Sequence, residues 1–352
     1  MRRDNAVPKC STGRRDFLKA AGMSAGLLAI SPFSSSSLLW AKAEEVYPAR
    51  NITMVVPYAV ASGFDTWLRV LSPYISKYLK ELSPMAKGGV IHMRNEPAAA
   101  GQRGYSVIFH SKPDGYTLGT FGGATTGLDM YMNPHGRREE VDFMKASFLL
   151  LGSTTEKILV TSKDGFKSWR DVLESLKKGP VRMSVGSASR FNHAAAVIMQ
   201  EKMGLKFKLV VFPSSGDGIN ALIRGDVQLA MGDDDSLNTL IKNKDIRPLI
   251  SFTETNVYPG ASNIQELGFP ELIQLFTGHR YLIAPPGLQM KQKQILLAAI
   301  KKASEDKEYI AKATTFGIHV AQVYGDDAEK DYKEFMKALG AQIPLLKKRF
   351  AE

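Results

Sequence analysis

Short apolar runs alternate with longer amphipathic segments along most of the chain. The run at residues 51–57 is rich in β-branched residues and ends at a proline, which predicts a buried strand. After the turn at 61–64, apolar residues recur at helical spacing over 67–82, and Asp65 is placed to cap this helix. Pro73 lies inside the segment, and we expect it to kink or split the helix.

The same alternation continues to about residue 231. Strands are expected at 88–93, 116–121, 157–161, 182–185, 207–212 and 227–231, and helices at 168–176, 192–203 and 217–223. This order favours an α/β fold with open sheets of mostly parallel strands. Ligands of such sheets bind at the carboxyl ends of strands, where loops and helix N-termini converge. The search for a site therefore starts at the turns that follow strands.

The first 43 residues have the pattern of an export signal. Arg14 and Arg15, followed by Asp16-Phe17-Leu18-Lys19, precede an apolar run at 20–30 and the small-residue sequence Ala41-Lys42-Ala43. The apolar run is too short to span a bilayer, which needs about 20 residues. The paired arginines resemble a twin-arginine signal, which implies export of the folded protein by the twin-arginine machinery. We expect cleavage near Ala43 and a soluble periplasmic protein; a retained anchor is the alternative.

The charge pattern argues against nucleic-acid binding. The 352 residues carry a formal net charge of +11, of which the first 43 residues supply +5. In the rest of the chain, lysine and glutamate are mostly interspersed, which favours a solvated, mildly basic surface. Cys10 is the only cysteine and precedes the apolar run, so neither an intramolecular disulfide nor a cysteine-based metal site is expected. The length suggests two domains.

Motifs for cofactor or catalytic chemistry are missing from the sequence. None of the six histidines pairs with a second ligand at metal spacing, and no Walker loop or G-x-S-x-G elbow occurs. The cluster 233–235 is three aspartates; it could hold a divalent cation, but a polar loop or helix start is favoured. Ser214, Ser215 and Asp217 could suggest hydrolysis, but helix capping is favoured. We expect no enzyme activity, no cofactor and no metal.

Several motifs resemble those of one family of solute-binding proteins. They resemble the proteins of tripartite tricarboxylate transporters, the Bug family, over roughly residues 47–350 in the following segments: Tyr47-Pro48-Ala49-Arg50-Asn51-Ile52, Val55-Val56-Pro57-Tyr58, Asp65 with Arg69, the loop at 95–104, Pro113-Asp114-Gly115-Tyr116-Thr117-Leu118 and Ala284-Pro285-Pro286-Gly287. The resemblance implies a two-lobed periplasmic binding protein of type II-like fold, each lobe an α/β sandwich. Lobe 1 would comprise 44–156 and 279–352, lobe 2 would comprise 157–278, and the chain would cross between them near Thr155 and His279.

The resemblance further implies a monomer that captures a small organic carboxylate between its lobes and delivers it to membrane transporter components. An orphan sensor that presents its ligand to a membrane receptor is the first alternative. An exported enzyme is the second, and the missing cofactor motifs count against it. The candidate ligand-binding residues lie in turns that follow strands, apart from Asp233 in the acidic cluster: Tyr58, Ser62, Gly63, Phe64, Asp65, Thr125, Ser187, Ser189, Arg190, His193, Ser214, Ser215 and Asp233.

The sequence departs from the family pattern in the first turn. Ala61 and Ser62 stand where the family has two glycines, and side chains there reduce close approach of a ligand to the backbone. Asp65 is favoured as a cap over a direct contact, and His193 as a packing residue over a ligand contact. Arg190 is either a carboxylate partner or a surface residue.

Two further expectations concern the ligand itself. Phe64, Trp67 and Phe191 form a hypothetical stacking site for an aromatic acid, with core packing as the alternative. The aspartates at 233–235 near the cleft disfavour a multiply charged anion, so a tricarboxylate ligand is not expected.

Overall fold

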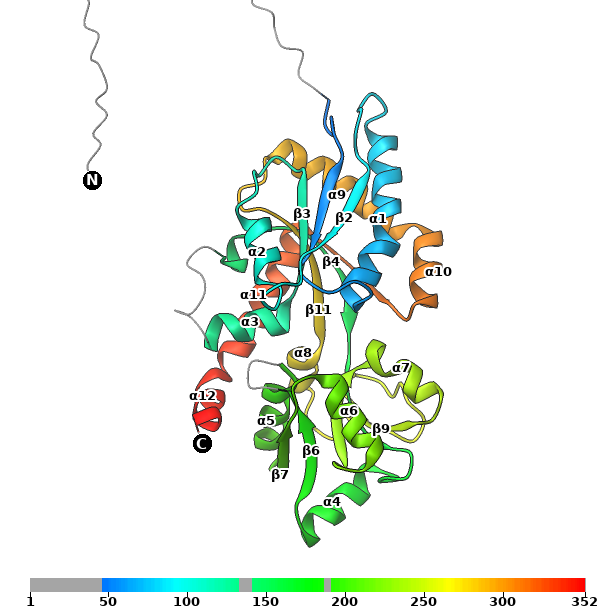
Figure 1. Cartoon of the computed structure of the whole chain (residues 1–352), viewed down its shortest axis with the longest axis vertical. Coiled ribbons are helices and arrows are strands. Elements are labelled where there is room, and N and C mark those ends of the chain that lie inside the picture. Colours follow the sequence, from blue (N-terminus) through cyan, green and yellow to red (C-terminus); the bar gives the residue numbers. More distant parts are fainter. Residues whose placement is uncertain (1–45, 133–140, 187–190, 352) are drawn as a thin grey trace, which may run out of the picture. The chain divides into compact units, whose positions relative to one another are not determined.

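Two six-stranded sheets organise the chain. The computed structural model describes residues 46–132, 141–186 and 191–351, which belong to one compact unit. The first sheet has the order β12-β4-β11-β3-β1-β2 and the second the order β10-β9-β5-β8-β6-β7 (Figure 1). The strands of the first sheet are β1 (Ile52–Val56), β2 (Ile91–Asn95), β3 (Thr117–Gly122), β4 (Ser147–Thr155), β11 (Gly278–Ala284) and β12 (His319–Tyr324). Those of the second are β5 (Lys157–Ser162), β6 (Val181–Val185), β7 (Phe207–Val211), β8 (Leu229–Asp233), β9 (Ile246–Ser251) and β10 (Ser262–Asn263).

Most strands in each sheet run in one direction. In the first sheet β1 to β4 share a direction, and β11 and β12 oppose it. In the second sheet only β5 opposes the other strands. The prediction of mostly parallel α/β sheets is therefore confirmed. Two of the three opposing strands, β5 and β11, are the first strands after the chain passes from one sheet to the other, and the third, β12, pairs with β4.

Helices cover both faces of each sheet (Figure 1). Around the first sheet these are α1 (Gly63–Leu82), α2 (Gln102–Phe109), α3 (Gly123–Met132), α9 (Met290–Glu305), α10 (Lys307–Thr315) and α11 (Gly325–Gly340). Around the second they are α4 (Trp169–Lys178), α5 (Phe191–Met203), α6 (Ser215–Arg224) and α7 (Asp234–Lys242). Helix α8 (Glu271–Phe276) precedes the return to the first sheet, a 3₁₀ turn spans Phe143–Lys145, and the C-terminal α12 (Ile343–Ala351) contacts α5. No helix within the described ranges is long and apolar enough to cross a membrane.

The alternation of side chains along the strands builds the core. In β5, Ile158 and Val160 pack with α6 and α7, while Leu159 between them joins the cluster on the opposite face. In β1, Met54 and Val56 face α1 and α9, while Val55 faces the other way. A strand with both faces buried reads as a continuous apolar run, which is why these segments are visible in the sequence.

Helix α1 is continuous through Pro73, so of the two expected effects, a kink or a split, the split does not occur. Leu71 and Ile75, on either side of the proline, are both fully buried against the first sheet and its covering helices. We attribute the continuity to this packing, because tertiary contacts commonly outweigh a local helix-breaking preference.

The chain crosses between the sheets twice. Strand β4 leads into β5 through Glu156 alone, and α8 leads into β11 through Thr277 alone. Gly278 pairs with Thr155 at the start of β11, so the two crossings lie side by side. The sequence-based lobe boundaries at 157 and 279 lie one residue from Glu156 and two residues from Thr277, respectively.

Candidate functional site

The turn between β1 and α1 is shaped by the carboxylate of Asp65. This side chain is 1% exposed. Its oxygens accept hydrogen bonds from the Ala61 backbone N–H at 2.8 Å, the Arg69 Nε at 2.8 Å and the Asn95 amide at 2.8 Å. Burial alone raises the pKa of Asp65, but these hydrogen bonds outweigh it and lower the pKa below its usual value. Asp65 thus organises the turn from within.

Ser62 caps the helix that follows, since its Oγ accepts a hydrogen bond from the Asp65 N–H at 3.3 Å. Ala61 has a φ of +62°, in the left-handed region that favours glycine. A glycine here, as in the family pattern, would adopt this conformation without strain, whereas alanine costs about 1 kcal/mol.

Two aromatic rings line one side of this turn. Tyr58 and Phe64 stack with ring centroids 3.9 Å apart and planes 5° apart. The Tyr58 hydroxyl accepts a hydrogen bond from the Gly122 N–H at 3.0 Å and lies 3.0 Å from the Tyr105 hydroxyl. Burial is the main cause of the raised pKa of Tyr58, so the hydroxyl stays neutral. The stacked pair is therefore fixed against β3.

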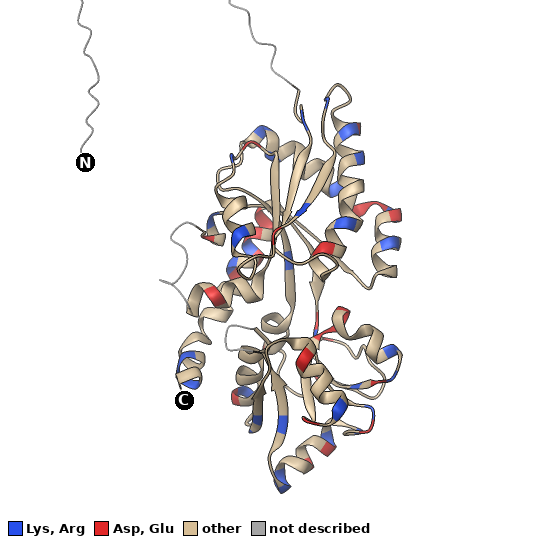
Figure 2. Cartoon of the chain, in the orientation of Figure 1, with Lys and Arg blue, Asp and Glu red and all other residues tan. Residues whose placement is uncertain are grey.

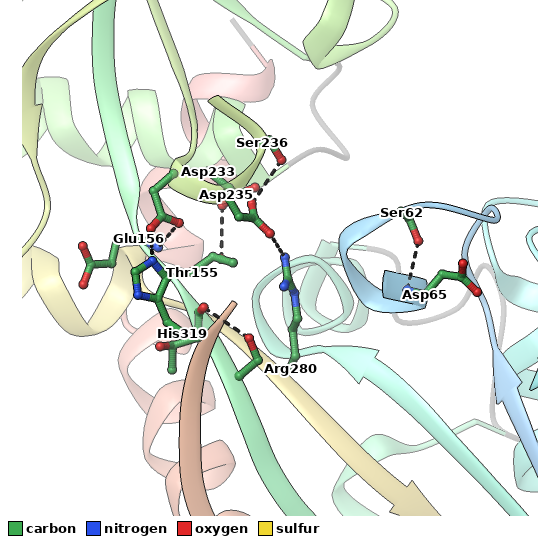
Figure 3. A network of polar contacts seen from close by, with 12 residues as sticks. Ser62, Asp65, Thr155, Glu156, Asp233, Asp235, Ser236, Arg280 and His319 are labelled. Atoms are coloured by element: carbon green, nitrogen blue, oxygen red, sulfur yellow. Dashed lines mark hydrogen bonds and ion pairs between the residues drawn. The ribbon is translucent and has the colours of Figure 1, made fainter. Parts of the chain in front are cut away.

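Arg280 of β11 reaches the first turn of α1 and lies beside Gly63. Its side chain is 8% exposed and forms an ion pair with Asp235, which is 13% exposed (Figure 3). The guanidinium carbon lies 5.1 Å from the centroid of Phe64. A methyl group on Gly63 would lie 2.6 Å from Nη2 of Arg280 and 3.0 Å from Oδ2 of Asp235. The first N–H groups of an α-helix have no acceptor within the helix, so an anion is favoured at this position.

The three consecutive aspartates have different partners. Asp233 forms an ion pair with Lys157 at 2.6 Å, and Asp235 with Arg280. Asp234 accepts a hydrogen bond from the Glu156 backbone N–H at 3.1 Å and forms an ion pair with His319. Within the described ranges no group of three or more potential metal ligands is gathered. These carboxylates connect the start of α7 to the crossing at Glu156, to β11 and to β12. They lie at the beginning of a helix, which is the role favoured from the sequence.

The other predicted site residues on the second sheet have structural roles or are exposed. Ser214 caps α6 by accepting a hydrogen bond from the Asp217 N–H at 3.1 Å, and Ser215 is exposed. The His193 ring packs edge-on against Phe350 at 4.8 Å between centroids. Burial lowers the pKa of His193 and outweighs an opposing backbone hydrogen bond. These contacts match the alternatives favoured from the sequence, which are packing for His193 and helix capping for Ser214.

Three predicted site residues, Ser187, Ser189 and Arg190, lie outside the described residues. Thr125 is exposed in the first turn of α3. The structure therefore brings Tyr58, Gly63 and Phe64 together with Arg280 and Asp235 at one place, and connects Asp233 to the neighbouring crossing.

The hypothetical three-ring stacking site is not formed. Trp67 is fully buried in the core between α1 and the first sheet. Phe191 is also buried, with its ring 6.5 Å from Phe276 and 6.5 Å from Phe335. Only Phe64 lies beside Arg280, and its stacking partner is Tyr58.

Sequence reasoning missed Arg280 and did not single out Asp235. Arg280 lies next to His279 in the segment assigned as a hinge, and its partner is 45 residues away. One signal was present: an arginine within the apolar run of β11, Gly278–Ala284, is a charge in a buried strand and requires a partner.

Comparison with known proteins identifies the family. The model of the tripartite tricarboxylate transporter family receptor matches residues 81–346. A UPF0065 protein of Agrobacterium vitis is 26% identical over 326 residues, which cover 90% of this chain and 89% of that protein.

Solved structures share the fold. A periplasmic transporter has a TM-score of 0.67 at 22% identity, covering 83% of this chain and 96% of that one. A protein of R. palustris with adipate has a TM-score of 0.66 at 18% identity, covering 86% and 98% of the two chains. MatC of Rhodopseudomonas palustris, with bound malate, has a TM-score of 0.64 at 18% identity, covering 85% and 100%.

These matches confirm the resemblance inferred from the motifs, and with it the two-lobed fold of periplasmic binding proteins. The chain belongs to the tripartite tricarboxylate transporter receptor family and is one of its solute-binding proteins.

Proposed function

We propose that this protein captures a small organic carboxylate in the periplasm and delivers it to the membrane components of a tripartite tricarboxylate-type transporter. The observation that carries the proposal is that the Arg280 guanidinium lies beside Gly63, in the first turn of α1. A helix N-terminus and a guanidinium both favour a carboxylate. Family membership supports the transporter as the recipient.

In this proposal the two sheets belong to two lobes, with boundaries at 44–156 and 279–352 for the first and 157–278 for the second. The ligand lies between them and contacts the turn at Tyr58 to Phe64 from one lobe. Turns of the second lobe, including the predicted Ser187, Ser189 and Arg190, complete the site. The paired crossings at Glu156 and Thr277 are short enough to act as a hinge, so closure traps the ligand.

Related structures support the ligand class. One neighbour contains malate and another adipate, both small aliphatic carboxylates. Membership of a family of transporter receptors supports binding without covalent chemistry. We therefore assign no enzyme activity to the protein.

The remaining parts of the proposal concern location and partners. The leader with Arg14 and Arg15 supports export through the twin-arginine machinery, with cleavage near Ala43. Basic and acidic residues are intermixed along the helices of both sheets, without a single-sign stripe (Figure 2). This distribution supports a protein that does not bind nucleic acid. The proposal also keeps the expected monomer, which the charge distribution does not bear on.

A thermal-shift screen of the mature protein tests the function. The panel contains mono-, di- and tricarboxylates, aliphatic and aromatic, with the corresponding primary amides as uncharged controls. A ligand at 100 times its Kd adds about 2.7 kcal/mol to the free energy of unfolding, which raises Tm by about 5 °C at this size. We expect such a shift with one class of acid and none with its amide. No shift with any acid would contradict the proposal.

A further inference from the structure

Arg280 is the only buried arginine in the described part of the chain, and its partner comes from the other sheet. Arg280 extends from β11 in the first sheet, whereas Asp235 lies in the first turn of α7, which follows β8 of the second sheet. The ion pair therefore joins the two sheets beside Gly63 (Figure 3).

Stability alone gives a weak reason for this pair. Removing two charges from water costs about as much as their attraction returns, so a buried ion pair contributes little net stability. A guanidinium offers five N–H donors in one plane, and one nitrogen of Arg280, Nη2, contacts Asp235. The guanidinium carbon lies over the ring of Phe64. The arrangement is a carboxylate-binding site that already holds a carboxylate.

We propose that Asp235 holds the place of the ligand's carboxylate, and that a ligand binds by displacing Asp235 from Arg280. This inference rests on the proposed function and adds how the ligand's carboxylate gains access to Arg280. The exchange replaces one carboxylate by another of the same chemistry, so Arg280 never remains buried without a partner. The second oxygen of Asp235 lies 3.2 Å from the Ser236 hydroxyl, which keeps one hydrogen bond for the displaced side chain.

The displaced Asp235 also sets the charge that the site accepts. After displacement its negative charge stays in the first turn of α7, beside Asp233 and Asp234. Asp233 and Asp234 keep their pairs with Lys157 and His319, so the displaced Asp235 is the carboxylate left without a cation. A second ligand carboxylate near this turn meets that charge in a largely buried setting, where repulsion is strong. The site therefore selects a monocarboxylate whose apolar body packs on the Tyr58–Phe64 stack.

The test compares acetate binding to the wild type and to Asp235→Asn, by calorimetry or by NMR titration of labelled acetate. Acetate carries a carboxylate and a single methyl group, so its binding depends little on the space around Arg280. Because Asp235→Asn removes the internal competitor, we expect acetate to bind about 10- to 100-fold more tightly, the range of one charge-assisted hydrogen bond. Equal or weaker binding by Asp235→Asn would overturn the proposal, because Asp235 would then orient Arg280 rather than compete with the ligand.

The double variant Arg280→Gln/Asp235→Asn separates displacement from simple loss of repulsion. It removes both charges and leaves no buried ion unpaired, and its urea unfolding curve checks that it folds. We expect the tightening to vanish in the double variant. Tightening that persists without Arg280 would overturn the proposal. Glu174→Gln on the surface of α4, which makes the same change in net charge, should bind acetate as the wild type does.

Hexanoate and adipate, which have equal chain length, test the selection by charge. We expect Asp235→Asn to improve adipate binding more than hexanoate binding; the reverse would overturn the monocarboxylate assignment. The acetate result is independent of the screen for the natural ligand. If a panel acid binds but Asp235→Asn does not tighten acetate binding, the displacement fails and the proposed function stands. If Asp235→Asn tightens acetate binding but no panel acid binds, the proposed function fails, so the two failures are distinguishable.

Discussion

Replacing Asp65 by asparagine tests whether this carboxylate holds the first turn of α1. Asp65→Asn keeps the size of the side chain but removes its charge and leaves an amide facing the Asn95 amide and Arg69. Arg69 is 47% exposed and regains water, so only part of the charged interaction is lost. The buried hydrogen bonds from Ala61 and Asn95 contribute more, and we expect a loss of about 2–4 kcal/mol in the free energy of unfolding.

Urea unfolding followed by circular dichroism measures this loss, which corresponds to a fall in Tm of about 4–8 °C. The matched control is Glu174→Gln, which removes an acid from an exposed pair with Arg170 on α4 and should cost less than about 0.5 kcal/mol. Because the folded-state pKa of Asp65 is lowered, its contribution is present above its unfolded value of about 3.9 and is lost as the pH falls through the folded value. A loss no larger than that of the control, or one that grows as the medium is acidified, would refute the reasoning.

Three further predictions concern other parts of the fold. Ala61→Gly should leave stability unchanged or raise it by up to about 1 kcal/mol in urea unfolding, because relief of the positive φ offsets the added freedom of the unfolded chain; a clear loss would show that the turn is not strained. The hydrogen bond to Asp234 raises the pKa of His319, so its stabilisation is full below about pH 6.5 and is lost as the pH rises through the folded value. His319→Gln should therefore lower stability more at pH 5.5 than at pH 8.5, and equal effects at both would contradict this assignment. Phe121→Ala should cost about 3–5 kcal/mol in urea unfolding, since the ring is fully buried against Phe143 and Tyr281; a cost below about 1 kcal/mol would contradict the packing.

Local patterns were enough to predict the elements and the fold class. The apolar run of β1 and the run around Ile158 belong to strands buried on both faces, so burial shows directly in the sequence. Ser214 was recognised as a cap because its partner is only three residues away. That Pro73 does not split α1 could not be predicted, because the outcome depends on packing against distant elements rather than on local preference.

The site could be predicted only in part. The turn at Ala61 to Asp65 follows a strand and precedes a helix, so its position could be predicted. The motif resemblance implied that this turn contacts the ligand. Arg280 was not predicted because its role depends on an ion pair with Asp235 between two sheets, and no local spacing encodes that contact. The stacking hypothesis took Trp67 for its nearness to Phe64 in the sequence and Phe191 for its place in the segment 186–193; the fold places both side chains in the core.

A crystal structure of the mature protein with the carboxylate that gives the largest thermal shift tests the central claim most directly. The account predicts the ligand carboxylate at the first turn of α1, bonded to the N–H groups near Gly63 and to Arg280, with Asp235 moved away. A ligand bound elsewhere, or a ligand carboxylate at this turn with the Arg280–Asp235 pair intact, would contradict it: the first would exclude the proposed site and the second the displacement of Asp235.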